Sequence, residues 1–198
     1  MSSLLEQPKG GATPLRVSVG RKECPSRHSL ANKIGRVLWG IAWCLLFRLT
    51  PRPMMGWRRM ILRAFGARIG RGAKIMPSTK IWAPWNLEMG EEACLSHNVD
   101  CYCVAPITIG AHATVSQYTY LCTATHDVED PHMRLVTAPI VIGDGAWIAA
   151  DVYVAPGVTI GEGAVVGVRS SVFHDMPPWK ICTGHPCKPI RERRLVGR

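Results

Sequence analysis

The segment IGDGAWIAADVYVAPGVTIGEGAVVGVRSSVF, residues 142–173, has an aliphatic residue at every sixth position. A small residue often follows the aliphatic one, as in IGDGAW, VAPGVT and IGEGAV. A period of six is neither the 3.6 of an α-helix nor the plain alternation of a flat strand. It fits three short strands in each turn of a parallel β-helix, with the aliphatic side chain inside and the small residue at the corner.

The same period runs back toward the N-terminus, with two short shifts. Its positions are Ile69, Ile75, Ile81, Leu87, Met89, Leu95, Cys101, Ile109, Val115, Leu121, Ile142, Ile148, Val154, Ile160, Val166 and Val172. A fixed period sustained over this length predicts a solenoid, in which each coil lies on the last and extends one shared core. We therefore expect an all-β fold with a parallel β-helix over residues 67–178, in a chain of 198 residues that is long enough for one buried domain.

The repeat is interrupted once at length, before it restarts at TAPIVI, residues 137–142. The polar residues 127–139 are predicted to leave the coils as a loop, and loops on a rigid scaffold commonly carry function. His126 stands at the base of this loop. Asp127 or Asp130 could hold one nitrogen of its ring and leave the other free as a base.

The repeats, the run YLCTATHDVEDPH at residues 120–132 and the ending GHPCKPIRER at residues 184–193 resemble the hexapeptide-repeat acyltransferases. The resemblance is greatest to the colanic-acid-type acetyltransferases, which are related to the galactoside and maltose acetyltransferases, and it spans about residues 33–195. It implies a left-handed β-helix, a homotrimer, and transfer of acetyl from acetyl-CoA to a sugar hydroxyl. The expected setting is the synthesis of an exopolysaccharide or another surface glycan.

In that family the histidine of a TxxHD-like turn is the general base, and the matching residue is His126, followed by Asp127. A positioned histidine removes the proton of an acceptor hydroxyl as it attacks the thioester, which contributes about 10²- to 10⁴-fold. The alternative is a corner histidine whose ring is satisfied by a carbonyl. We favour catalysis because His126 closes a repeat just before the long loop. Cys122 fills a small-residue position, so we do not expect it to be a nucleophile, and transfer should be direct.

The resemblance also implies an acetyl-CoA groove between adjacent subunits. The matching positions are Trp147, Ala150, Val168, His174, Lys188 and Arg191. Ala150 would offer a backbone contact, and Lys188 and Arg191 would meet the nucleotide phosphates, which bind cations well. His174 stands where relatives usually have a lysine, and this departure weakens one expected contact.

The residues that would bind the acceptor are less well defined. In SHNVDCYCV, residues 96–104, the polar residues Ser96, Asn98 and Asp100 lie near the family's acceptor positions without a clean match. They are the candidate substrate-binding residues. A serine, an aminosugar or an antibiotic could replace the sugar, and the acetylated hydroxyl stays open.

Residues 31–66 have helical periodicity, and we expect helices over residues 31–47 and 55–65. The apolar side of the first would carry Ile34, Leu38, Ala42 and Leu45. The second has arginines beside tryptophan, which suits a helix at a lipid surface. The alternative is that these helices cap the open end of the β-helix, which a stacked fold needs. The two roles are compatible.

The basic charge of the chain lies in its N-terminal part. Residues 1–80 hold 16 Lys and Arg against 2 acids, and residues 81–198 hold 8 against 12. The sequence shows neither a motif of a nucleic-acid-binding fold nor aromatic residues spaced to stack on bases, so nucleic acid is not an expected partner. The apolar run at residues 37–47 is shorter than the roughly 20 residues of a spanning helix and does not resemble a signal peptide. We expect a cytoplasmic protein with contact to the inner face of the membrane.

Two tails flank the folded part in this interpretation. Residues 1–30 mix Pro, Gly, Ser and cations without periodicity and are predicted to be a disordered basic tail. Residues 179–198 are predicted to be a basic C-terminal tail segment. The eight cysteines show no zinc spacing, so reduced thiols are expected.

Two other classes of function stay open. Trimeric β-helix carbonic anhydrases bind zinc through histidines at subunit interfaces, and His97, His112, His126 and His132 could be compared with such a set. Their spacing does not follow the required pattern, and no metal is expected. The second alternative is a non-catalytic scaffold subunit of a glycan-synthesis complex, which would have no reason to bind CoA.

Overall fold

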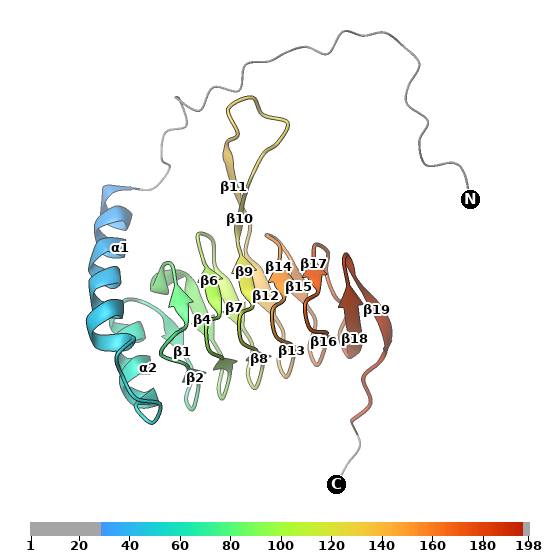
Figure 1. Cartoon of the computed structure of the whole chain (residues 1–198), viewed down its shortest axis with the longest axis horizontal. Coiled ribbons are helices and arrows are strands. Elements are labelled where there is room, and N and C mark those ends of the chain that lie inside the picture. Colours follow the sequence, from blue (N-terminus) through green and yellow to red (C-terminus); the bar gives the residue numbers. More distant parts are fainter. Residues whose placement is uncertain (1–28, 196–198) are drawn as a thin grey trace.

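The structure, a computed structural model, describes residues 29–195, and residues 1–28 of the predicted basic tail lie outside this range. Two helical segments stand at one end of a prism of short strands (Figure 1). Helix α1 (Leu30–Ala42) continues as a π-helical turn, η2 (Trp43–Phe47). Helix α2 (Met55–Ala64) follows after the break at the prolines, close to the predicted position.

The strands of the prism form three sheets. The first contains β1 (Arg68–Ile69), β4 (Leu87–Met89), β7 (Ile107–Ile109), β12 (Ile140–Ile142) and β15 (Thr159–Ile160). The second contains β2 (Lys74–Ile75), β5 (Cys94–Leu95), β8 (Thr114–Val115), β13 (Trp147–Ile148), β16 (Val165–Val166), β18 (Lys180–Gly184) and β19 (Cys187–Glu192). The third contains β3 (Lys80–Ile81), β6 (Asp100–Tyr102), β9 (Tyr120–Cys122), β14 (Tyr153–Val154) and β17 (Ser171–Val172).

The chain visits the first, second and third sheets in turn, and neighbouring coils pair in parallel, as in Ile75 with Leu95 and Val154 with Val172. A short 3₁₀ turn, η3 (Pro84–Asn86), joins β3 to β4. The predicted parallel β-helix is therefore confirmed. Its sheets meet at three edges, which we name the first–second, second–third and third–first edges after the sheets that they join.

All the predicted sixfold positions lie in the core, and none is more than 7% exposed. A second buried position stands two residues before each of them except Leu87, and it often carries alanine. The alanines are Ala67, Ala73, Ala93, Ala113, Ala146 and Ala164. The narrow interior of the prism explains this choice, because alternating small and large side chains fill it without voids.

Glycines form a column at the first–second edge. The column contains Gly70, Gly90, Gly110, Gly143 and Gly161. A Cβ on Gly143 would lie 2.5 Å from the amide nitrogen of Glu162, and a Cβ on Gly90 would lie 2.5 Å from that of Ala111. Adjacent coils approach so closely at this edge that no side chain fits between their backbones.

Helix α2 closes the open end of the first coil with its arginines. Arg58 is fully buried, its Nε donates to the carbonyl of Ile75 at 2.7 Å, and burial lowers its pKa. Arg59 donates to the carbonyl of Ala73. Arg63 likewise donates to a carbonyl of the first coil. These arginines cap the β-helix and do not project as a set toward a lipid surface.

Helix α1 packs on the same end through different residues from those expected. Ala42 is buried, but Ile34, Leu38 and Leu45 are 51%, 55% and 63% exposed. The residues that face the β-helix are Trp39 and Phe47, whose rings meet edge to face at 5.8 Å. The apolar stripe read from the sequence is real, but it points outward because the tryptophan ring fills the contact.

The helix from Leu30 to Phe47 is longer than the apolar run seen in the sequence. It has 18 residues and is apolar enough, by length and composition only, to cross a membrane, with 17% of it buried. One helix of this kind is weak evidence for a span, since core helices can also have this composition. Residues 29 and 30, the last two of the predicted tail, belong to the start of α1. Ser29 is its N-cap, and its Oγ accepts the backbone N–H of Asn32.

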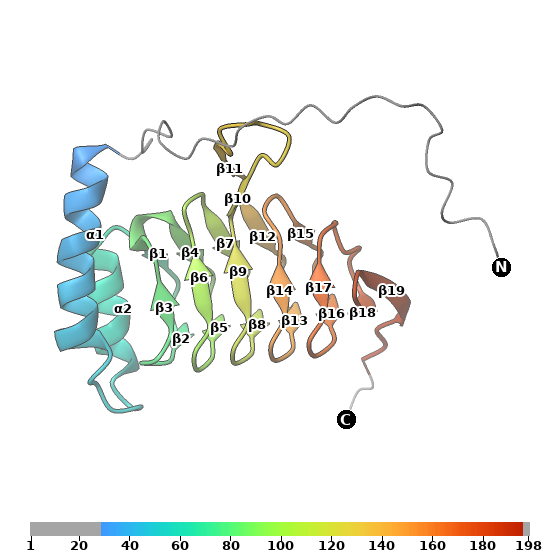
Figure 2. The same cartoon turned by 45° about the horizontal axis from the view of Figure 1, so that its top comes forward.

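The interruption of the repeat is a β-hairpin. Strands β10 (Ala124–His126) and β11 (Leu135–Thr137) pair antiparallel, so the segment predicted as a loop over residues 127–139 contains a strand. The hairpin projects from the third–first edge, well away from the sheets (Figures 1 and 2).

The C-terminal segment also continues the fold. Strand β18 pairs in parallel with β16, and β19 folds back antiparallel on β18. The segment predicted as a tail over residues 179–198 therefore extends the second sheet and covers the far end of the prism, up to the last described residue, 195.

Candidate active site

His126 is the last residue of β10 and its side chain is exposed. Its Nδ1 lies 2.6 Å from the carbonyl oxygen of Met133, across the hairpin. A carbonyl can only accept a hydrogen bond, so Nδ1 carries the proton of the neutral ring and Nε2 has a free lone pair. The hairpin thus presents an oriented base at the edge of the prism.

Neither nearby acid bonds to this ring, contrary to expectation. The carboxylate of Asp127 accepts the backbone N–H of Glu129 at 3.1 Å. Asp130 pairs with Arg134 and accepts the N–H of His132 at 3.0 Å, and the guanidinium lowers the pKa of Asp130. The two carboxylates stabilise the tight turns of the hairpin tip, as aspartate commonly does. The Met133 carbonyl, which the sequence does not reveal, orients the base.

Trp147 and the turn after it present an apolar surface with free donors. Trp147 lies on β13, is 47% exposed and donates from Nε1 to Ser116 Oγ at 3.0 Å. Ala150 and Val168 occupy successive turns of the second–third edge, linked by the bond from the Arg169 N–H to the Ala150 carbonyl. Within residues 29–195 the N–H groups of Ala150 and Val168 meet no acceptor. The two turns therefore offer two backbone donors beside a half-exposed indole.

The predicted phosphate contacts lie farther along the same sheet. Lys188 and Arg191 are exposed on β19, which β16 and β18 separate from β13. Neither forms an ion pair with an acid of the described chain, and Arg191 donates from Nη1 to the carbonyl of Glu192. His174 stands in the exposed turn after β17, at the third–first edge. The two cations of β19 fit a phosphate group.

One chain does not bring the base and the expected CoA residues together. His126 leaves the third–first edge, whereas Ala150 and Val168 lie at the second–third edge, at the other ends of the strands of the third sheet (Figure 2). A side of about six extended residues spans roughly 20 Å. Within one chain, His126 and these two residues therefore do not line one pocket.

The candidate acceptor residues are dispersed as well. Asn98 is in a left-handed turn with φ 57°, and its N–H donates to Ser78 Oγ. Ser96 uses its backbone to bond the next coil. Asp100 lies on the third sheet opposite Tyr120, and burial raises its pKa while Lys80 opposes that shift. Of the three, Asp100 alone lies on a strand, β6, that pairs with β9, the strand leading to the hairpin of His126.

An aromatic column on the third sheet was not anticipated. It runs through Trp82, Tyr102, Tyr120, Tyr153 and Phe173, with ring centroids 5.7 to 6.3 Å apart. Burial raises the pKa of the Tyr120 and Tyr153 hydroxyls. The sequence signal for this column was the recurrence of aromatic residues about once per coil. It was hard to see because Trp82, Tyr102 and Phe173 follow a core position, whereas Tyr120 and Tyr153 precede one.

The cysteines are structural. Cys122 is buried and its thiol donates to the carbonyl of Ala124 at 3.1 Å. Burial raises the pKa of Cys103 and of Cys182 to about 11. The cysteines of residues 29–195 are free thiols and form no disulfide among themselves.

The histidines considered as zinc ligands lie apart within one chain. His97 bonds Arg52 and Ser78 at the second–third edge. His112 occupies a left-handed turn at the first–second edge, with φ 58°. In the part of the chain from residue 29 to residue 195, no three metal-binding side chains gather.

Comparisons with known proteins agree with the fold and the motifs. Residues 139–174 match the family described as Bacterial transferase hexapeptide (six repeats). The chain is 47% identical over 162 residues to WcaF of Escherichia coli (strain K12), which is named for acetyl transfer in colanic acid biosynthesis. That match covers 82% of this chain and 89% of the relative.

Two further relatives carry named ligands or substrates. The galactoside O-acetyltransferase of Escherichia coli (strain K12) is 29% identical over 138 residues, which is 68% of each chain. A hexapeptide-repeat acetyltransferase of Vibrio cholerae O1 biovar eltor, solved with acetyl coenzyme A, is 26% identical with a TM-score of 0.77. The superposition covers 84% of this chain and 91% of that one.

Proposed function

The chain belongs to the hexapeptide-repeat acetyltransferases, and on that premise we propose that it acetylates a sugar hydroxyl in surface-glycan synthesis with His126 as the general base. Acetyl-CoA is the donor used in this family. The observation that carries the proposal is the exposed His126 ring, whose Nδ1 is held by the Met133 carbonyl so that Nε2 can accept a proton.

The proposed chemistry needs one base and no covalent enzyme intermediate. Acetyl-CoA, when bound, would supply the thioester carbonyl carbon to which the acceptor oxygen bonds. Nε2 of His126 takes the proton of the attacking hydroxyl, and the bond from Nδ1 to Met133 stabilises the imidazolium that forms. The carbon–sulfur bond would then break, and CoA would leave as a thiolate that takes the proton held by His126. Cys122 has no part in this step because its side chain is buried and its thiol donates to the carbonyl of Ala124.

The donor would lie along the second sheet. Trp147, Ala150 and Val168 would hold the pantetheine arm, and Lys188 and Arg191 would bind the phosphates. His174 stands at the third–first edge, the edge from which the hairpin of the same chain projects. The sugar class follows from the names of the relatives, which refer to galactoside and to colanic acid biosynthesis.

The function is tested by the release of CoA from acetyl-CoA in the presence of sugars, nucleotide sugars and lipid-linked sugars. Acceptor-dependent release, together with an acetylated sugar in the mass spectrum, would support the proposal. Calorimetric titration with CoA separates the enzyme from a scaffold subunit. Absence of CoA binding would exclude the transferase, whereas binding without release from any sugar would exclude the sugar hydroxyl as acceptor.

We also propose a homotrimer in which each site combines His126 of one chain with the groove of the next. Mixing His126→Ala chains with Ala150→Trp chains, in which the indole would fill the groove, should restore activity. Random assembly leaves about a quarter of the sites with both parts intact. The measurement is turnover after joint refolding, compared with each variant refolded alone. Activity no higher than that of the separate variants would place the site within one chain.

Helix α1 is proposed to attach the protein peripherally to the inner face of the membrane, in the cytoplasm. An exposed apolar stripe supports this attachment. The stripe contains Leu30, Ile34, Val37, Leu38, Ile41, Leu45 and Leu49. Such a face inserts into a lipid surface, and the neighbouring Lys33 and Arg48 would favour anionic headgroups.

The membrane attachment predicts binding to vesicles that contain anionic lipid. Leu38→Glu should lower the bound fraction severalfold, because it places a charge in the apolar stripe that would insert into the lipid. Val128→Glu is the control, since Val128 is also exposed, at 81%, but lies on the hairpin. Sedimentation of the trimeric protein with vesicles is the measurement. Equal binding by both variants would contradict the role of α1.

A further inference from the structure

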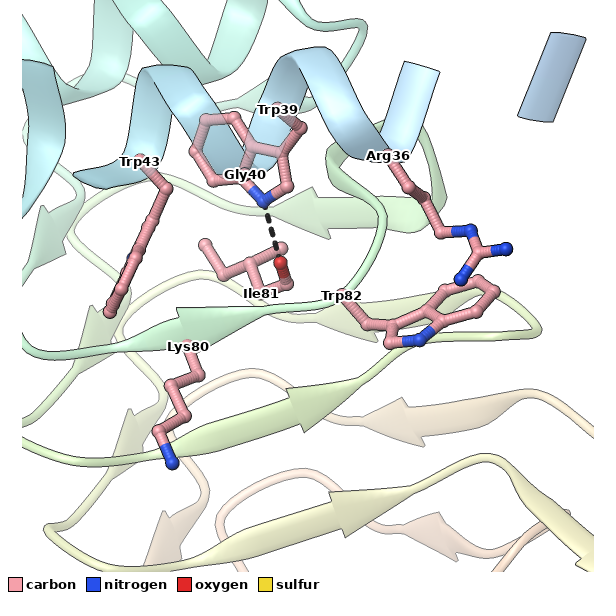
Figure 3. Close-up of a pocket in the computed structure, with 7 residues that line it drawn as sticks. All are labelled: Arg36, Trp39, Gly40, Trp43, Lys80, Ile81 and Trp82. Atoms are coloured by element: carbon pink, nitrogen blue, oxygen red, sulfur yellow. Dashed lines mark hydrogen bonds between the residues drawn. The ribbon is translucent and has the colours of Figure 1, made fainter. Parts of the chain in front are cut away.

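Helix α1 and the first coil enclose an open cavity that the proposed chemistry does not use (Figure 3). Its volume of about 350 Å³ is within the range of sites for small ligands. Tryptophans and cations line it: Trp39, Trp43, Trp82, Arg36 and Lys80. Figure 3 shows Trp43 and Trp82 on either side of Trp39, with Arg36 and Lys80 at opposite ends.

The walls of the cavity are held in place by hydrogen bonds. The Nε1–H of Trp39 donates to the carbonyl of Ile81 at 2.6 Å. The Nε1–H of Trp43 donates to the carbonyl of Thr79 at 2.9 Å. Both indole rings are therefore fixed by the first coil, and the cavity exists before any ligand arrives. Preformed walls lower the cost of ordering side chains on binding.

The charge in the cavity is positive. The guanidinium of Arg36 lies 4.3 Å from the centroid of the Trp82 ring and bonds the amide oxygen of Asn32. Lys80 stands across the strand pair from Asp100, whose pKa is raised by burial against the opposing effect of the Lys80 charge. Neither Arg36 nor Lys80 forms an ion pair with an acid of residues 29–195. Because Arg36 and Lys80 carry two positive charges and Asp100 is the one acid described nearby, the cavity favours a ligand with an anionic group.

The cavity opens onto the aromatic column that leads toward His126. Lys80 and Trp82 flank the buried Ile81, so they share the outer face of the third sheet. The column passes from Trp82 through Tyr102 to Tyr120 on β9, the strand that runs on to the hairpin. Two coils separate β3 from β9, which is about 10 Å along the prism at the usual strand spacing. His126 stands beyond β9 on the projecting hairpin, so the separation from the cavity exceeds this distance. Only a ligand longer than one sugar unit would reach both places.

We propose that this cavity is a remote acceptor subsite that binds a pyranose carrying a negative charge, as a phosphate or a carboxylate. The sugar ring would lie against the indoles, and Arg36 and Lys80 would balance its charge. The enzyme would then select a charged oligosaccharide and place another unit of it at His126. This inference rests on the proposed function for its biological meaning, but binding at the cavity can be measured without catalysis.

The test uses the trimeric His126→Ala protein and isothermal titration or saturation-transfer NMR. Glucose 1-phosphate and glucuronate are the anionic probes, and methyl glucoside and inorganic phosphate are the neutral and sugar-free controls. We expect binding of at least one anionic sugar, and the preferred probe identifies the anion. Tighter binding of methyl glucoside or of phosphate alone, or binding of none of the probes, would overturn the proposal.

A matched pair of variants locates the binding. Lys80→Met should raise the Kd of the anionic sugar about fivefold or more, because a charge-assisted contact is lost. Lys74→Met is the control, since Lys74 occupies the same place in β2, one strand earlier, and pairs with Glu92 outside the cavity. Equal Kd values for Lys80→Met and the parent protein, or equal losses in both variants, would refute this site. Binding that follows the expected pattern without any acetyl transfer by the wild type would retain the subsite and reject the proposed function.

Discussion

Replacing His126 with alanine is expected to lower kcat for acetyl transfer by about 10²- to 10⁴-fold, the usual contribution of a general base. The KM for acetyl-CoA should change little, because His126 would act on the acceptor hydroxyl, whereas Trp147, Ala150 and Val168 would hold the donor. The variant should also keep the melting temperature of the wild type, since the ring is exposed and makes one hydrogen bond. Initial rates of CoA release and thermal unfolding provide the two measurements.

His132→Ala is the matched control for this variant. His132 is exposed on the same hairpin, and the interaction recorded for it uses its backbone N–H, which alanine retains. It should therefore keep its rate within about twofold, as expected for a surface side chain outside the reaction. A rate for His126→Ala close to that of the control would remove this imidazole from the mechanism. Equal large losses would show that the shape of the hairpin matters and not the base.

Gly143→Ala should destabilise the fold by about 2 to 3 kcal/mol, the upper part of the range for overpacking. The added Cβ would lie 2.5 Å from the backbone nitrogen of Glu162, so the coils must move apart where they share hydrogen bonds. The coil of Gly143 pairs with a coil on each side, so displacing it would disturb the contacts of both neighbouring coils. The measurement is the melting temperature of the protein at fixed concentration.

Gly40→Ala provides the comparison for this glycine. Gly40 is in α1, and a Cβ there would meet no atom within 4 Å. Alanine should stabilise the helix by up to about 1 kcal/mol, because it restricts the unfolded chain. If Gly143→Ala melted at or above the temperature of Gly40→Ala, close approach of the coils would not be the reason for the glycine column.

The sequence was sufficient for the parts of the structure that depend on local periodicity. The buried positions from Ile69 to Val172 follow from the period of six, since each coil repeats the same contact with its neighbour. The place where the chain leaves the coils, at the strand that ends with His126, follows from the loss of that period. The bounds of α2 were also close to those predicted, because helical periodicity and prolines mark them.

Contacts between distant segments could not be predicted in this way. The expected partner of the His126 ring was an adjacent acid, but the partner is the Met133 carbonyl, which the pairing of β10 with β11 brings close. A carbonyl is present at every residue, so composition cannot single one out. The tail-like segment after residue 178 likewise became strand only through pairing with β16.

The sequence by itself determined the β-helix, the place where the chain leaves it, and the family whose motifs it shares. The tertiary structure alone decided which face of α1 is buried, which groups orient His126, and that the aromatic column and the cavity at Trp82 lie on one surface. The physical reason is that periodicity reports which side of a segment is apolar. What that side meets depends on the shape and hydrogen-bonding groups of segments far away in the chain, and only folding brings them together.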